Sequence, residues 1–193
     1  ASVVPSLDEM FMEGIRSYIG VPCLRVSQKL NTGLKIQMKN PTGLGADRLL
    51  NAVAGIARYG APLIVVDLGT TITLDVISAE GAYLGGTISP GMEIAMDSLF
   101  ARAAKLPQVA LEAPAHYIGG NTIEAIQSGV VHGFVGLVDS LVSGVFSELG
   151  GPCAVVATGG HAPILAAHSK IVKTVDQWLT LDGLRIIYEK NPL

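Results

Sequence analysis

The sequence predicts an α/β fold in which a hairpin sheet comes first and helices alternate with a further strand afterwards. Two observations support this prediction. Residues 63–66 form an apolar run, and from 71 to 76 polar and apolar residues alternate. Longer stretches on both sides instead repeat their apolar residues every three to four positions. Period-two alternation is typical of antiparallel strands, and the longer period is typical of helices.

The composition argues against several classes of protein. The chain has 193 residues, 49% of them hydrophobic, and a formal net charge of -3 with only 13 lysines and arginines. Without a dense basic run, this charge disfavours nucleic acid or an anionic membrane as partner. Polar residues interrupt every hydrophobic stretch, and the two cysteines, Cys23 and Cys153, lie far apart. We therefore expect a cytoplasmic protein that binds a small ligand, with no membrane span, disulfide framework or zinc site.

The N-terminal part predicts two helices. After a short β-type run at 1–4, Ser6 and Glu9 form a capping-box pattern that predicts a helix to about residue 18. Turn-forming residues then precede a second helix at 47–59, which Gly60 is expected to end as its C-cap.

The central part predicts the hairpin sheet. Residues 63–66 form the first strand, and the alternation at 71–76 predicts a half-buried antiparallel strand. A turn at 78–82 leads into a third strand at 83–89, and a helix follows to about residue 105.

A long helix is expected around residues 122–149, with Asn121 or Thr122 as its cap. Each glycine inside a helix costs roughly 1 kcal/mol relative to alanine, so close packing is the expected reason for four of them. That packing could occur within the domain or between subunits. The four are Gly129, Gly133, Gly136 and Gly144.

The C-terminal part predicts a buried strand at 153–158 that ends in Gly159 and Gly160, then a short helix and a last helix. The complete order of three strands, two helices, a strand and a helix is the ribonuclease-H-like plan. Ligands are expected where the strand ends and the hairpin loops meet.

The first candidate site lies at the end of the first strand. The strand delivers Asp67 to its end, and Gly69 can let the backbone turn tightly. Nearby hydroxyls are offered by Thr70, Thr71 and Thr73. Backbone N–H groups and hydroxyls can surround phosphoryl oxygens while the carboxylate holds a cation. Alternatively, Asp67 simply caps a turn and the threonines are ordinary strand residues.

The second candidate site precedes the helix at 47–59. Gly43 and Gly45 allow a bent approach, and Asp47 and Arg48 follow in the first helical turn, which favours anions. Asp47 could accept the proton of an attacking hydroxyl, and Arg48 could bind a carboxylate or phosphate. The alternative is a helix N-terminal acid beside a surface arginine.

Taken together, these stretches resemble type III pantothenate kinase over essentially the whole chain. The resemblance is carried by "GADRLLNAVAG", "VVDLGTTITLDVIS", "GAYLGGTISPGM", "IGGNTIEAIQSG" and "ATGG", in that order and spacing. It implies the actin-like kinase superfamily, with two ribonuclease-H-like halves and ATP between them. The implied reaction is ATP-dependent phosphorylation of pantothenate to 4'-phosphopantothenate, the first step of coenzyme A biosynthesis.

The resemblance also implies ligands and residue roles. ATP with Mg²⁺ is the implied phosphoryl donor, a monovalent cation (K⁺ or NH₄⁺) is an implied cofactor, and a homodimer is the implied assembly, with the pantothenate pocket near its interface. Gly159 and Gly160 could line the adenosine side of the cleft or merely turn the strand. The implied roles are proton acceptor for Asp47, pantothenate binding for Gly45, Ala46, Asp47, Arg48 and Thr122, ATP binding for Gly69 and Thr70, and cation binding for Asp67.

Two features depart from the family pattern. The Asp-x-Gly-Asn-Thr phosphate loop of the family does not precede residue 1, and Met38 stands where a substrate-contacting tyrosine is expected. We therefore expect residues 1–60 to be the remainder of an N-terminal half-domain, residues 61–193 to be the C-terminal half-domain, and the chain alone to be inactive. The missing loop also keeps open a catalytically silent relative that acts as a regulatory or accessory protein.

Overall fold

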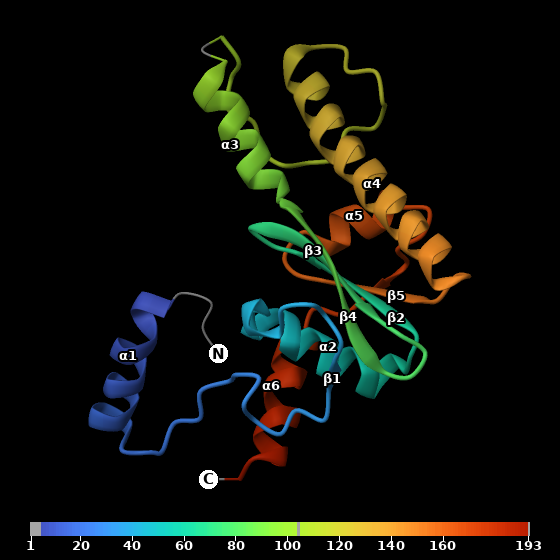
Figure 1. Cartoon of the computed structure of the whole chain (residues 1–193). Helices are drawn as coiled ribbons and strands as arrows, with labels where there is room; N and C mark the ends of the chain where they lie inside the picture. The colour runs from blue at the N-terminus through green and yellow to red at the C-terminus, as the bar shows by residue number, and fades with distance from the viewer. Residues whose placement is uncertain (1–4, 104, 193) are drawn as a thin grey trace.

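The computed structural model describes residues 5–103 and 105–192, which are built around a six-stranded mixed sheet (Figure 1). The strand order is β1-β4-β3-β2-β5-β6, and β3 alone runs against the others. This is the ribonuclease-H-like arrangement, so the predicted fold class is confirmed. The strands are β1 (Lys35–Ile36), β2 (Leu63–Leu68), β3 (Thr71–Ile77), β4 (Ala82–Pro90), β5 (Ala154–Thr158) and β6 (Thr174–Val175).

Helices cover both faces of the sheet. On one face α2 (Ala46–Tyr59) and α6 (Leu179–Lys190) share a core with Leu63 and Val65. On the other face α4 (Thr122–Leu149) and α5 (Ala162–His168) share a core with Ile64 and Val66. Burial on both faces explains why β2 is a continuous apolar run and does not alternate.

Two further helices lie outside these layers (Figure 1). Helix α3 (Met92–Arg102) follows β4 and extends away from the sheet. Helix α1 (Pro5–Gly14) continues as a π-helical turn (Ile15–Ile19), as the helical pattern predicted. Its start at Pro5 places Ser6 inside the helix, so the predicted capping position is wrong, and the β-type run predicted at 1–4 lies outside the described residues.

The packing of α2 bears on the division of the chain. This helix precedes residue 60, yet its apolar residues share one core with β2 and α6. The boundary between half-domains at residues 60 and 61 stays a prediction.

Strand β3 is more buried than the sequence predicts. Alternation predicted a half-buried strand, but Thr73 and Asp75 are buried along with their apolar neighbours. The polar face of β3 is covered because α2, which comes earlier in the chain, packs across it. These polar residues consequently lie inside the fold and require partners there.

Helix α4 has the predicted extent, and Asn121 caps it by accepting a hydrogen bond from the Glu124 N–H at 3.0 Å. Its buried residues include Val131, Val135 and Val138. The predicted close packing at the four helix glycines is wrong within this chain, because a Cβ at each would meet nothing within 4 Å. The glycine face of α4 is therefore open.

By length and hydropathy alone, α4 is also the one helix among the described residues that could cross a membrane. The sequence prediction that no stretch is apolar enough was therefore too strict. Since one face of α4 packs on the sheet, as core helices of globular proteins do, this is weak support for a membrane span.

Candidate active site

Helix α2 carries a polar edge over the buried polar residues of the sheet. Asp47 and Arg48 lie in its first turn, and Asn51 follows one turn later. Opposite them, Asp67 pairs with Thr73 across β2 and β3. Paired and alternate strand residues share a face, so Asp67, Thr73 and Asp75 all face α2. The polar side chains of α2 therefore lie close to those of β2 and β3.

Asp67 is held from α2. The Asn51 side-chain amide donates a hydrogen bond to Asp67 Oδ2 at 2.9 Å, and Asn51 Oδ1 accepts one from Thr180 Oγ1 at 2.6 Å. Burial raises the pKa of Asp67, the Asn51 hydrogen bond lowers it, and the charge of Asp47 raises it. That repulsion requires the two predicted acids to lie close enough to influence each other.

Asp67 also fits a cation. Its Oδ1 accepts no hydrogen bond from the described residues, while its Oδ2 is committed to Asn51. Asp67 is half-buried, and a carboxylate with one oxygen left free by the described residues attracts positive charge. The donor is a hard oxygen, which suits an alkali or ammonium ion.

Asp47 lies over the start of α2. Gly45 is the N-cap, with extended backbone, and a Cβ at this position would collide with Asp47 Oδ1. The Asp47 carboxylate therefore folds back toward Gly45, near the free N–H groups of the first turn. Ala46 is the first residue of the helix and is half-buried.

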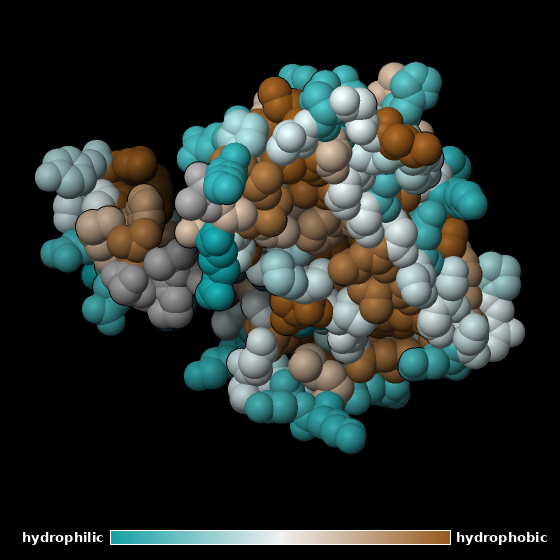
Figure 2. Space-filling model, turned by 90° about the horizontal axis from the view of Figure 1, so that it is seen from above, coloured by the Kyte–Doolittle hydropathy of each residue, from teal (hydrophilic) through white to brown (hydrophobic). Residues whose placement is uncertain are grey.

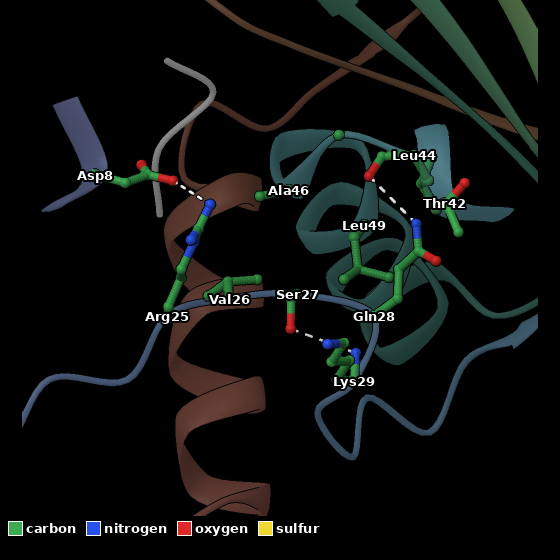
Figure 3. Close-up of a pocket in the computed structure, with 11 residues that line it drawn as sticks. Asp8, Arg25, Val26, Ser27, Gln28, Lys29, Thr42, Leu44, Ala46 and Leu49 are labelled. Atoms are coloured by element: carbon green, nitrogen blue, oxygen red, sulfur yellow. Dashed lines mark hydrogen bonds and ion pairs between the residues drawn. The ribbon is translucent and has the colours of Figure 1, made fainter. Parts of the chain in front are cut away.

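A pocket of about 710 Å³ lies beside this loop (Figure 3). Figure 3 shows Arg25 pointing across it to Asp8 of α1, while Gln28 bonds the Leu44 carbonyl at 3.4 Å. Gly45 and Ala46 line the pocket, but Asp47 does not. The pocket thus adjoins the predicted substrate loop without including the two acids.

Arg48 is not a surface residue, so that alternative is wrong. Its side chain is only 12% exposed, and its Nε donates a hydrogen bond to Asp75 Oδ1 at 2.7 Å. The same carboxylate oxygen accepts a hydrogen bond from the Tyr83 hydroxyl at 2.6 Å. Arg48 Nη2 is buried without a hydrogen-bond partner among the described residues.

The loops at the end of β2 gather beside Asp67. The β2–β3 turn places Thr70 at the surface, where its carbonyl accepts a hydrogen bond from the Gly91 N–H at 3.0 Å. Gly159 follows β5 with a φ of +91°, and a Cβ there would lie 2.7 Å from Asp67 Oδ1. Gly160 has open space around it.

The tight turn after β2 does not require glycine at Gly69, contrary to the prediction. Its φ is not positive, and a Cβ there would make only ordinary contacts, at 3.9 Å. Glycine is required instead at Gly159, for its φ and its close contacts, and at Gly91, where a Cβ would collide with the Gly69 carbonyl oxygen.

Thr122 does not join this group within the chain. It is exposed at the start of α4, on the opposite face of the sheet from α2 (Figure 1). Met38 packs against the core beneath α2 and α6, which explains an apolar residue at this position.

Several residues of the site were missed from the sequence. Asn51 had a detectable signal, because it interrupts the apolar stripe of α2 one turn after Asp47. Asp75 also had a detectable signal, because it is an acid between the apolar residues Leu74 and Val76. Tyr83 and Thr180 had none, since their roles depend on contacts between distant segments.

The fold and the site define an α/β protein of the actin-like class, with acids gathered at the end of the central strand. The family model for type III pantothenate kinase matches residues 1–144. The chain is 47% identical over 191 residues to the type III pantothenate kinase of Moorella thermoacetica, covering 99% of the chain and 75% of that protein. It is 49% identical over 189 residues to that of a Roseiflexus species, covering 98% and 74%.

The chain belongs to the type III pantothenate kinase family, as its motifs predicted. Among solved structures it resembles one from Campylobacter jejuni described as a conserved putative Baf family transcriptional activator. That likeness has a TM-score of 0.65 and 25% identity, and it covers 100% of this chain and 81% of the other.

Proposed function

We propose that the full-length protein carries out the ATP-dependent phosphorylation of pantothenate to 4'-phosphopantothenate, with Asp47 as the proton acceptor. Family membership supports the reaction. The observation that supports the residue assignment is that Asn51, one helical turn after Asp47, donates a hydrogen bond to Asp67 Oδ2 at 2.9 Å, which joins the helix start to the strand end. The reaction needs a base close to a phosphate whose charge is offset. Asp47 can serve as the base, and Asp67 can hold the cation that offsets the charge. A cytoplasmic location is part of this proposal.

In this proposal the loop from Gly45 to Arg48 binds pantothenate. Asp47 orients the primary hydroxyl and takes its proton as the bond to phosphorus forms. Arg48 binds the substrate carboxylate. The adjoining pocket of about 710 Å³ is of the size that small-molecule sites have, so it can seat the rest of the molecule.

ATP enters with Mg²⁺ as the substrate that supplies the phosphoryl group. Gly69, Thr70, Gly159 and Gly160 surround the strand end where its phosphates would lie. A monovalent cation at Asp67 would offset phosphate charge there. Among the described residues no group of three or more His, Cys, Asp or Glu side chains could hold a metal ion by itself.

A coupled ADP-release assay on the full-length protein tests this function. We expect ADP release that depends on pantothenate and is faster with potassium than with sodium. A second candidate is a regulatory or accessory role, favoured by the description of the C. jejuni structure. If ATP binds but adding pantothenate causes no ADP release above the background, the result would support that role and overturn the kinase proposal.

Replacing Asp67 with asparagine should weaken the dependence on potassium or ammonium and raise the KM for ATP. The neutral amide keeps the size of the side chain but attracts a cation far less. Rates measured over a titration of KCl at constant ionic strength check this. An unchanged cation profile would count against the assignment of Asp67.

We also propose that the family's homodimer forms through α4. The glycines of α4 face away from its buried valines and meet no atoms of this chain. Figure 2, seen from the side of α3 and α4, shows hydrophobic patches, and the exposed apolar residues of these two helices include Ile94, Leu99 and Ile123. Thr122 starts this helix, so it would lie close to the interface with a second copy docked here.

Gly136→Arg should therefore convert the dimer to a monomer in sedimentation velocity. The exposed position leaves the monomer fold unaffected, whereas a charged side chain would separate two packed helices. Tyr188→Arg, on the exposed face of α6 across the sheet, is the matched control and should stay dimeric. A dimer that persists in Gly136→Arg would exclude this face.

A further inference from the structure

Asp75 is a fully buried acid to which neither the motifs nor the family comparison gives a role. It lies in the middle of β3 with 0% exposure, paired with Val65 of β2 and Gly86 of β4. A buried carboxylate is costly unless its partners satisfy it, and a buried ion pair adds little stability compared with apolar packing. Stability alone is therefore a weak reason for Asp75 to be there.

The two shortest hydrogen bonds of Asp75 converge on a single oxygen, while Thr73 Oγ1 donates a longer one to Oδ2 at 3.5 Å. Arg48 Nε and the Tyr83 hydroxyl both donate to Asp75 Oδ1, at 2.7 and 2.6 Å. The Arg48 guanidinium also lies 5.9 Å above the Tyr83 ring. One carboxylate and one aromatic ring thus fix both the position and the plane of the guanidinium.

The other guanidinium nitrogens have no hydrogen-bond partner among the described residues. Nη2 is buried, and it lies 3.2 Å from where a Gly86 Cβ would be. Guanidinium N–H groups are strong donors, and leaving one buried and unpaired costs on the order of 1–3 kcal/mol or more. A buried donor without a protein partner requires an explanation, and a ligand that accepts its hydrogen bond supplies one.

We propose that Asp75 is a positioning residue, which holds Arg48 through Nε so that the remaining guanidinium nitrogens can bind the carboxylate of the acceptor substrate. The inference rests on the proposed function and adds a residue to it. The geometry suits arginine in particular, because a planar fork fixed at one nitrogen presents its other nitrogens in a defined direction. Tyr83 supports the arrangement by binding the same oxygen.

The location of Asp75 suits this role. Strand β3 lies inside the sheet between β2 and β4, and its residue Thr73 pairs with Asp67. One rigid strand therefore sets the place of Arg48 relative to the strand end where ATP is proposed to bind. Because Arg48 follows Asp47 directly, the same anchor also limits movement of the proposed base.

The pKa of Asp75 gives an additional readout. Burial raises it to about 6, although Arg48 and Tyr83 lower it, and the charge of Asp47 raises it. Arg48 and Asp47 face it from α2 and Tyr83 from β4. Below about pH 6 the acid becomes protonated and loses its charge, so its hold on Arg48 weakens. The KM for pantothenate should then rise as the pH falls through this range.

The test is steady-state kinetics of Asp75→Asn in the full-length protein. We expect the KM for pantothenate to rise about tenfold and the KM for ATP to stay within about twofold. The rise in KM between pH 7 and pH 5.5 should be much smaller in the variant, since asparagine does not titrate. A purely structural role would lower kcat and affect both KM values together.

Two further variants keep the inference testable if Asp75→Asn folds poorly. Tyr83→Phe keeps the ring and removes one hydrogen bond, and it should raise the KM for pantothenate about threefold. In an Arg48→Lys background, Asp75→Asn should have little further effect, because the fork that it positions is gone.

The outcomes separate two failures. A wild-type protein that releases no ADP with pantothenate would overturn the proposed function. An active wild type whose KM for pantothenate is unchanged in both Asp75→Asn and Tyr83→Phe would overturn the role of Asp75 alone.

Discussion

Replacing Asp47 with asparagine should lower kcat by about two orders of magnitude or more while the KM for pantothenate changes little. Asparagine has nearly the same shape, so it can still occupy the space beside Gly45 at the start of α2. It cannot take a proton at neutral pH, and the attacking hydroxyl would have to lose its proton to water. Initial rates from coupled ADP release, with pantothenate varied at saturating ATP, measure both constants.

A control variant shows whether losing one negative charge elsewhere on the protein affects kcat. Glu148→Gln removes an exposed acid near the far end of α4 and should leave kcat unchanged. Asp67 offers a second check, because the charge of Asp47 raises its pKa and Asp47→Asn should let that pKa fall. A kcat near that of the wild type in Asp47→Asn would refute the assignment of the base.

The sheet and most helices were predictable because their signals are local. Strand β2 is apolar throughout, the chain turns after it, and the periodic stripe of α2 ends at Gly60, whose φ of +77° favours glycine. Asn121 at the start of α4 is a local signal of the same kind. Such signals reflect backbone preferences that neighbouring residues set.

The burial of β3 was not predictable in the same way. Alternation of Thr73 and Asp75 with apolar residues is the pattern of a strand with one wet face, and nothing nearby in the sequence contradicts it. The face is dry because α2 packs across it and supplies Arg48, which lies 27 residues before Asp75 in the chain. Contacts of this range depend on the whole fold.

The candidate site was predicted in part. The structure brings Asp47, Asp67 and Gly159 together, whereas Thr122 lies across the sheet. The motif that contains Thr122 indicates a substrate-binding residue. It gives no information about which face of the sheet the helix of Thr122 covers. The contact of Thr122 with the substrate stays a prediction, and it would require a second copy of the chain.

Gly159→Ala should lower both stability and activity, because two separate constraints meet at this residue. Its φ of +91° is strained for any L side chain, and an added Cβ would lie 2.6 Å from the Leu68 carbonyl oxygen and 2.7 Å from Asp67 Oδ1. We expect a loss of about 2–3 kcal/mol in the free energy of unfolding, measured by denaturant titration. The displaced Asp67 should also raise the KM for ATP.

The neighbouring glycine provides the control for stability. Gly160 has no positive φ, and a Cβ there would meet nothing within 4 Å, so Gly160→Ala should unfold at nearly the wild-type denaturant concentration. Any change in its KM for ATP would then report contact with the nucleotide, separate from strain. If Gly159→Ala were as stable as Gly160→Ala, the strand end would be loose enough to accept a side chain. Asp67 would then lack the rigid surroundings that its proposed cation site requires.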